Sequence, residues 1–396
     1  MRTSAPSSAH QSWPRGLWVL CIATLIIQTG YGTILPLLPL YAEHRGFSLP
    51  WIGAMAALYA LASFAGQWVL GKRSDVIGRR LLLIIGAGIT AVATALFVLR
   101  VPAPLYLGFR VLQGLGAAAF LPAANALVGD LVPDAQRGSA YGYLSSASMA
   151  GFALGPLVGG VLSSVWGLSA PFVFGSVLAG IAMFGVMRGL PQGEGGLGYD
   201  IDREVPKSPS LSRALWPLFI VNFGWTGLIG MYDTVWSLYM KFLGASNVVI
   251  GLSFTFFAVP LLLTNFLGGR LANARSRRKA LILGGSLLNV ATVFLYIASR
   301  SVWLSIVVSM VEAISMSFIG PALQAQLMHA IPRHLRGTIQ GRFQAMGTLG
   351  ALVMSITSGI LMIHSIRTPF WAGAGLMAGT TLAFALTGLR DSVARL

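Results

Sequence analysis

The sequence has little charge and almost no cysteine. Only 10% of its 396 residues are charged, and just 11 residues are acidic. A soluble domain needs far more charge on its surface, so this composition excludes an ordinary soluble protein. The single cysteine, Cys21, excludes a disulfide framework and a cysteine-ligated metal centre.

Catalytic signatures are missing as well. The sequence shows no nucleophile–base set and no glycine-rich phosphate loop. The histidines have no metal-ligand spacing, and most lie in or beside polar segments: His10, His44, His329, His334 and His364. We therefore expect no enzymatic activity, no metal site, no cofactor and no direct use of ATP.

Long apolar runs dominate the chain instead. Hydrophobic residues make up 55% of it, and the mean hydropathy is +0.75. A helix needs about 20 apolar residues to cross a bilayer. Twelve runs approach or exceed that length, which predicts an all-α integral membrane protein with spans at 17–40, 51–70, 81–99, 104–128, 139–163, 168–187, 214–240, 248–268, 280–299, 301–328, 338–363 and 369–389.

A polar stretch divides the spans into two groups of six. The expected organisation is a tail over 1–16, a six-helix bundle over 17–188, a linker over 189–213, a second six-helix bundle over 214–389 and a tail over 390–396.

The second group of spans repeats the first. The segments Gly71–Arg80 and Gly269–Arg278 lie 198 residues apart, and Pro122 matches Pro321 at an offset of 199. A repeat of membrane-length segments at half the chain length is typical of transporters built from two similar halves.

The basic residues predict the orientation of the chain. With both termini inside, 21 of the 27 Lys and Arg residues fall on inner segments, and five fall on outer segments: Arg45, Arg100, Lys241, Arg300 and Arg367. This bias predicts a multi-pass protein of the cell's inner membrane, with both termini and the linker in the cytoplasm. Because the charge is confined to short segments between spans, it is typical of membrane topology rather than of a nucleic-acid partner.

The segment Gly71–Arg80 resembles the loop signature of the major facilitator superfamily, G-x-L-A-D-R-x-G-R-R/K, between the second and third helices. It departs from that signature at Arg73, Ser74 and Val76. The resemblance implies two pseudo-symmetric bundles and a conformational gate, for which the candidates are Gly71, Asp75, Gly78, Arg79, Arg80, Asp130, Gly269, Asn273 and Arg277. The alternative is that the basic residues of the loop only orient the protein.

The fourth span carries a second resemblance. Arg110-Val111-Leu112-Gln113-Gly114-Leu115-Gly116-Ala117 is similar to the superfamily's R-x-x-Q-G-x-G-A signature. In proton-coupled members that signature is linked to proton transfer, which makes Arg110 a candidate coupling residue. The alternative is a structural arginine that donates hydrogen bonds to backbone carbonyls of a neighbouring helix.

Two acidic residues fall inside spans, Asp233 on the seventh and Glu312 at the centre of the tenth. A charge at the bilayer centre costs about 2.5–3.5 kcal/mol on insertion scales, so each is a functional candidate. A carboxyl group in a cavity of low dielectric constant can bind and release a proton near neutral pH. We expect Glu312 to be the main coupling site, with Arg110 across the cavity from it. The alternatives are a permanently neutral Glu312 and an Asp233 that contacts water at the outer mouth.

Aromatic and amide side chains accompany these acids and predict the substrate cavity. The candidates are Gln28, Tyr31, Gln113, Asn222, Trp225, Tyr232 and Trp236. Such a cavity suits a lipophilic or cationic substrate through stacking and cation–π contacts. Trp236 and Tyr239 have an alternative role, in the aromatic belt at the membrane interface.

The fifth span contains a glycine motif that the second half lacks. Residues 151–160 resemble the antiporter signature G-x-x-x-G-P-x-x-G-G, and we expect close helix packing at Gly151, Gly155, Pro156, Gly159 and Gly160. The resemblance favours drug:proton antiporters over sugar facilitators.

These observations predict a secondary active transporter, a monomer that exports small lipophilic or cationic compounds in exchange for protons by alternating access. One alternative is a lipid or metabolite exporter, or an uncoupled facilitator, of the same superfamily. An alternative of another class is a membrane sensor or scaffold that does not transport.

Overall fold

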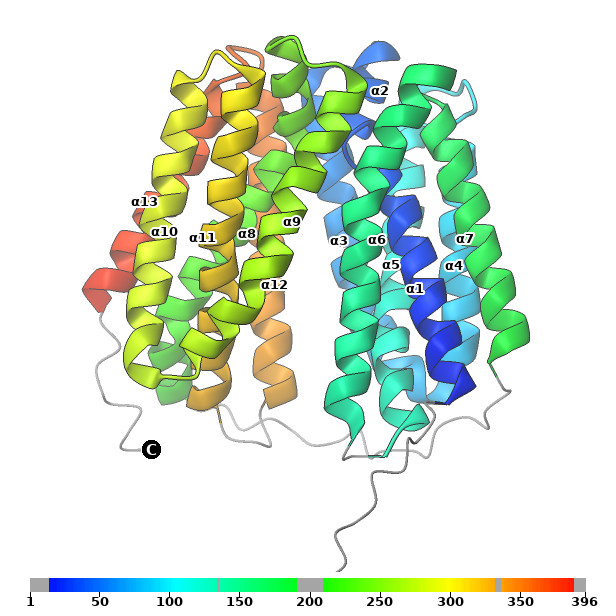
Figure 1. The fold of residues 1–396 in the computed structure, drawn as a ribbon, viewed down its shortest axis with the longest axis horizontal. Helices are drawn as coiled ribbons and strands as arrows, with labels where there is room; N and C mark the ends of the chain where they lie inside the picture. The colour runs from blue at the N-terminus through cyan, green and yellow to red at the C-terminus, as the bar shows by residue number, and fades with distance from the viewer. Residues whose placement is uncertain (1–13, 134–135, 191–208, 332–335, 388–396) are drawn as a thin grey trace, which may run out of the picture.

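The computed structural model describes residues 14–133, 136–190, 209–331 and 336–387, and these residues form thirteen α-helices without a strand (Figure 1). The predicted C-terminal tail, most of the N-terminal tail and most of the linker lie outside the described residues. Within them, twelve segments are long and apolar enough to cross a membrane. Helices suit this composition because the bilayer core offers no water to bind unpaired backbone groups.

The first half comprises α1 to α7. Their bounds are α1 Arg15–Ile34, α2 Leu38–His44, α3 Leu49–Ile77, α4 Arg79–Leu96, α5 Ala103–Leu131, α6 Arg137–Trp166 and α7 Ala170–Gly189. The first span is divided into α1 and the short α2, and Pro36 lies at the break. Proline lacks the backbone N–H that a continuous helix would use there.

The second half comprises α8 to α13, with bounds α8 Pro209–Phe242, α9 Asn247–Ala272, α10 Arg275–Ala298, α11 Val302–Ala330, α12 Arg336–Leu361 and α13 Thr368–Thr387. Figure 1 shows the two halves beside each other, with α6 and α9 on the facing sides. The expected all-α fold with two six-span bundles is confirmed.

The segment expected to be a loop at 71–80 is largely helical, which corrects that expectation. Helix α3 continues to Ile77 and α4 begins at Arg79, so only Gly78 separates them. Gly78 has a φ of 90°, a left-handed backbone conformation that glycine adopts without a steric penalty. The chain therefore reverses direction at a single residue.

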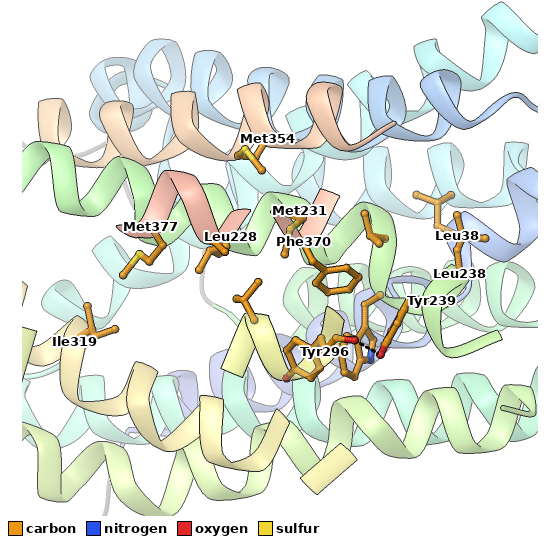
Figure 2. Packing of buried hydrophobic residues seen from close by; sticks show 14 of the residues in the cluster. Leu38, Leu228, Met231, Leu238, Tyr239, Tyr296, Ile319, Met354, Phe370 and Met377 are labelled. Carbon is orange, nitrogen blue, oxygen red and sulfur yellow. Dashed lines mark hydrogen bonds between the residues drawn. The ribbon is translucent and has the colours of Figure 1, made fainter. Parts of the chain in front are cut away.

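An aromatic cluster lies within the hydrophobic core of the second half. Figure 2 shows Tyr239, Tyr296 and Phe370 packed together, and the Tyr239 hydroxyl donates a hydrogen bond of 2.8 Å to the Tyr296 carbonyl. Tyr239 is fully buried and Trp236 is only 5% exposed. The alternative that Trp236 and Tyr239 belong to an interfacial belt is therefore wrong, because neither side chain reaches the lipid.

The two halves are joined near the end of the molecule that carries α2. Glu43 on α2 forms an ion pair of 2.7 Å with Lys241 on α8. Gly53 on α3 packs against Gly359 on α12, and Gly160 on α6 packs against Asn247 on α9. The halves diverge toward the opposite end, where α1 begins (Figure 1).

Candidate functional site

Two cavities lie in the interior between the joined end and the diverging end. The first, of about 130 Å³, belongs mainly to the first half, and its polar lining includes Gln28, Tyr31, Tyr59, Arg110 and Gln113. The second, of about 250 Å³, belongs mainly to the second half, and its lining includes Trp225, Tyr232, Asp233, Trp236, Tyr296 and Glu312. Phe152 of α6 lines both cavities, so one aromatic side chain lies between them.

Arg110 of α5 is anchored in the wall of the first cavity. It is only 4% exposed. Its Nε donates to the Met55 carbonyl of α3 at 3.2 Å, its Nη1 donates to Gln113 Oε1 at 2.8 Å, and its guanidinium lies 4.4 Å from the Tyr59 ring centroid. The carbonyl bond fits the structural role considered for this arginine. The guanidinium group of Arg110 also contacts the Tyr59 ring and lines the cavity, so its positive charge faces the interior of the protein as well.

Glu312 of α11 is buried in the second cavity with 1% exposure. The Tyr232 hydroxyl donates to its Oε1 and the Tyr296 hydroxyl donates to its Oε2, each at 2.7 Å. No Lys, Arg or His within the described residues forms an ion pair with it. Two neutral donors thus hold a buried carboxyl group, and hydrogen bonds to a carboxylate are among the stronger ones in proteins.

Asp233 of α8 lies in the same cavity but has a different partner. Asp233 and Arg110 interact electrostatically across the interface between the halves, but they form no ion pair within the described residues. The expected position of Arg110 across the cavity from Glu312 is not supported, because the hydrogen bonds of Arg110 go to Met55 and Gln113 and its electrostatic interaction is with Asp233. Glu312 instead accepts its hydrogen bonds from Tyr232 and Tyr296. The two intramembrane acids therefore have distinct environments, one beside a cation and one beside phenols.

Of the seven predicted substrate residues, six line a cavity: Gln28, Tyr31 and Gln113 in the first, and Trp225, Tyr232 and Trp236 in the second. Asn222 is the exception, because it lines neither of these two cavities. It is 1% exposed, and its side-chain amide donates to the Phe343 carbonyl of α12 at 2.7 Å, which ties α8 to α12.

Three cavity residues that matter to the site were not predicted: Tyr59, Phe152 and Tyr296. Tyr296 lies close to the end of its span in the sequence, where an aromatic residue suggests an interfacial position. Phe152 stands within the glycine motif and resembles an ordinary lipid-facing residue. Only the cross-helix contacts reveal their positions.

The candidate gate of the first half is partly described. Arg79 forms an ion pair with Asp130 of α5 and donates to the Ala126 carbonyl at 2.7 Å, while Arg80 donates to the Met187 carbonyl at 2.5 Å. These bonds tie the start of α4 to the ends of α5 and α7. Gly71 and Asp75 belong to the backbone of α3, but the contacts of Gly71 and of the Asp75 side chain lie outside what the structure describes.

At the corresponding place in the second half, the buried arginine differs from the expected one. Arg278 is 9% exposed, and it donates to the Ala272 carbonyl at 2.7 Å and to the Ala325 carbonyl at 3.4 Å. Because Ala325 matches Ala126 at an offset of 199, Arg278 corresponds to Arg79. The predicted Arg277 is exposed, so the residue that corresponds to Arg79 lies at an offset of 199 rather than 198, and a gating role for either arginine stays a prediction.

The other two second-half gate residues lie at the same end of the molecule. Asn273 follows the last residue of α9, and its backbone N–H donates to the carbonyls of Arg270 and Leu271. Gly269 lies in the last turns of α9, with open space where a side chain would begin. Neither position shows, within the described residues, a contact with the first half that would identify a gate.

The glycine motif of α6 packs against two helices. A Cβ atom at Gly155 would lie 2.6 Å from the Cα of Gly32 on α1, and one at Gly160 would lie 2.7 Å from the Asn247 carbonyl oxygen on α9. Gly151 and Gly159 also face α1, and the Pro156 carbonyl faces Gly251 of α9. The motif therefore serves both the packing within the first half and the contact between halves.

A family model and individual known sequences match this chain, and they indicate the same family. The family model described as Major Facilitator Superfamily matches residues 20–244 and 218–395. Multidrug resistance protein 2 of Bacillus subtilis (strain 168) is 26% identical over 96% of this chain and 97% of its own length. Quinolone resistance protein NorA of Staphylococcus aureus is 22% identical over 92% of this chain and 95% of its own.

Solved structures show the same fold. A mutant of the nucleoside transporter NupG has a TM-score of 0.77 at 14% identity, and the match covers 94% of this chain and 99% of that one. A bacterial homolog of the human lysosomal transporter Spinster, in an inward-facing and occupied conformation, has a TM-score of 0.72 at 16% identity, and the match covers 96% of each chain.

Proposed function

The chain belongs to the major facilitator superfamily, and on that premise we propose that it exports small lipophilic or cationic compounds in exchange for protons. Members of this family transport and do not catalyse, and the multidrug and quinolone resistance relatives favour drugs as the substrate class. The observation that carries the proposal is Glu312, a buried carboxyl group held by two tyrosines in an aromatic cavity.

The second cavity suits a lipophilic substrate. Its lining combines Trp225, Tyr232 and Trp236 with two acids, so an aromatic cation gains stacking, cation–π and ionic contacts at once. The buried Nε1 of Trp225 has no hydrogen-bond partner within the described residues. It offers a donor to a polar group on the substrate.

The surroundings of Glu312 suit a group that gains and loses a proton. When ionised, it accepts hydrogen bonds from Tyr232 and Tyr296. When protonated, it needs an acceptor for its own hydrogen. The side chain of Asn289 on α10 interacts with Glu312, and the Asn289 Oδ1 atom is buried without a partner within the described residues. Both protonation states therefore find suitable neighbours.

The proposed cycle alternates access between the two ends. We place the basic end of each bundle, with Arg79 and Arg278, in the cytoplasm, in accordance with the bias in Lys and Arg. The end joined through Glu43 and Lys241 then faces outward, so this structure is closed to the outside. A substrate would enter between the diverging helices and leave after the halves rock about the cavities.

The orientation makes a prediction of its own. In a background without Cys21, Asp200→Cys in the linker should resist a membrane-impermeant thiol reagent added to intact cells and should react after lysis. Rapid labelling in intact cells would reverse the proposed topology. The cell's inner membrane as the location and a monomeric state belong to the same proposal.

The function itself is tested by transport in vesicles. Purified protein in proteoliposomes, under an imposed pH gradient, should drive uptake or efflux of lipophilic cations and neutral drugs from a panel that also includes lipids. Transport that ignores the gradient would identify an uncoupled facilitator. Binding without transport would identify a sensor or scaffold.

A further inference from the structure

A polar cavity of about 610 Å³ opens on the first half at the end that carries α2, away from the two interior cavities. Its walls come from α2, from the connection between α4 and α5, and from the turn between α6 and α7. The residues used below are His44, Arg45, Arg100, Trp166 and Ser169. None of them takes part in the proposed transport site.

The charged residues that line this cavity are all basic. Arg45 and Arg100 line it together with His44, and no carboxyl group of the described residues does. The acid closest in sequence, Glu43, is engaged by Lys241. Only five Lys and Arg residues lie on the predicted outer segments of the chain. Two of these five line this one cavity, so positive charge is concentrated there.

The first of these arginines is held in place before any ligand arrives. Arg45 Nη2 donates to the Tyr41 hydroxyl at 2.6 Å and to the Val98 carbonyl at 3.3 Å, and Tyr41 itself donates to the Phe97 carbonyl. Arg100 is exposed and makes no such bonds to the part of the chain that the structure describes. One fixed and one adaptable guanidinium thus flank the same space.

An apolar groove of about 470 Å³ continues from this cavity along α6 and α7. Leu162, Val173, Phe174 and Val177 line it, and Trp166 and Ser169 line both the groove and the polar cavity. Val173 and Val177 are about half exposed and Trp166 is 71% exposed. Because α6 and α7 are long and apolar enough to cross a membrane, these exposed apolar side chains are expected to face the lipid.

We propose that this continuous site binds an anionic phospholipid. The phosphate lies between Arg45 and Arg100, and one acyl chain follows the groove between α6 and α7. Trp166 is placed at the boundary between headgroup and acyl chain, where indole rings prefer to lie. The N-terminus of α7, beginning at Ala170, adds the positive end of a helix dipole to the same cavity.

The chain supplies a matched control for the test. Arg100 follows α4 and Arg300 follows α10, so the two arginines occupy similar places in the two halves, and both are exposed. Only Arg100 lines the polar cavity. Replacing either by glutamine removes the same charge from the same end of the protein.

Purified full-length protein in detergent would be titrated with fluorescent phosphatidylglycerol and with phosphatidylcholine of the same acyl chains. The wild type should prefer phosphatidylglycerol. Arg100→Gln should weaken that binding about fivefold, as expected for one basic residue beside an anionic headgroup, and Arg300→Gln should leave it unchanged. Val173→Trp, which fills the groove, should weaken the binding of both lipids.

Three outcomes would overturn the proposal. Equal losses in Arg100→Gln and Arg300→Gln would show only general attraction to an anionic lipid. Equal binding of the two lipids by the wild type would remove the role of the arginines. Displacement of phosphatidylglycerol by millimolar inorganic phosphate would assign the cavity to free anions, and the groove would have no part in it.

Discussion

The contact between Gly160 and α9 gives the sharpest test of how the two halves meet. A Cβ atom at Gly160 would lie 2.7 Å from the Asn247 carbonyl oxygen and 3.1 Å from the Val248 Cα. Carbon atoms prefer about 3.5–4.0 Å, so Gly160→Ala requires α6 and α9 to move apart. Both obstructing atoms are backbone, which cannot rotate away.

Overpacking of this kind costs about 1–3 kcal/mol. The cost is incurred only while the halves are closed at the α2 end, so the ratio of closed to open states should fall by about 5- to 150-fold. Gly251→Ala should act in the same direction, because its Cβ would lie 3.2 Å from the Gly160 Cα.

Pulsed EPR can follow this shift. Spin labels at the exposed Ser48 and Phe242, in a background without Cys21, report the separation of the halves at the α2 end. Gly160→Ala should lengthen the distance distribution. Gly180→Ala is the control, since open space surrounds Gly180 on α7. The same distribution in both variants would refute the claim that α6 and α9 form the closing contact.

Two further predictions concern single side chains. Tyr296→Phe removes a hydrogen bond to Glu312 and should reduce gradient-driven export about tenfold or more, because bonds to charged groups contribute about 1.5–3 kcal/mol. Tyr239→Phe leaves the hydrogen bonds of Glu312 in place and should not reduce export. Equal export by the two variants would mean that the bond to Glu312 is incidental. Arg278→Gln should lower the thermal unfolding temperature of the protein, since it removes buried donors to two carbonyls. Arg277 is exposed, so Arg277→Gln should leave that temperature unchanged. Equal unfolding temperatures of the two variants would contradict the assignment of Arg278.

The twelve spans could be predicted from the sequence because the bilayer imposes a length of apolar residues on each of them. The expected run at 104–128 corresponds to Ala103–Leu131, and the run at 280–299 corresponds to Arg275–Ala298. The turn at Gly78 could not be placed to the residue. A helix can continue through polar residues beyond the apolar run, as α3 does. The hydropathy of the sequence therefore does not show where such a helix ends.

The candidate site was predictable where a residue type is costly in a membrane. Arg110, Asp233 and Glu312 stand out because charge is rare inside spans. The neighbours of each were not predictable, because they depend on the rotation of α5, α8 and α11 about their own axes. The same limit explains Asn222, which faces α12 rather than a cavity, and Tyr296, which faces Glu312 rather than lipid.

In the proposed cycle, Glu312 couples proton movement to export. Glu312→Gln fixes the neutral form in a side chain of nearly the same shape, so it cannot release a proton. In proteoliposomes under an imposed pH gradient, this variant should lose gradient-driven export and keep gradient-independent exchange of substrate, while Asp233→Asn should show a smaller loss. Gradient-driven export at the wild-type rate by Glu312→Gln would contradict the claim. If Asp233→Asn lost export instead, the coupling role would pass to Asp233.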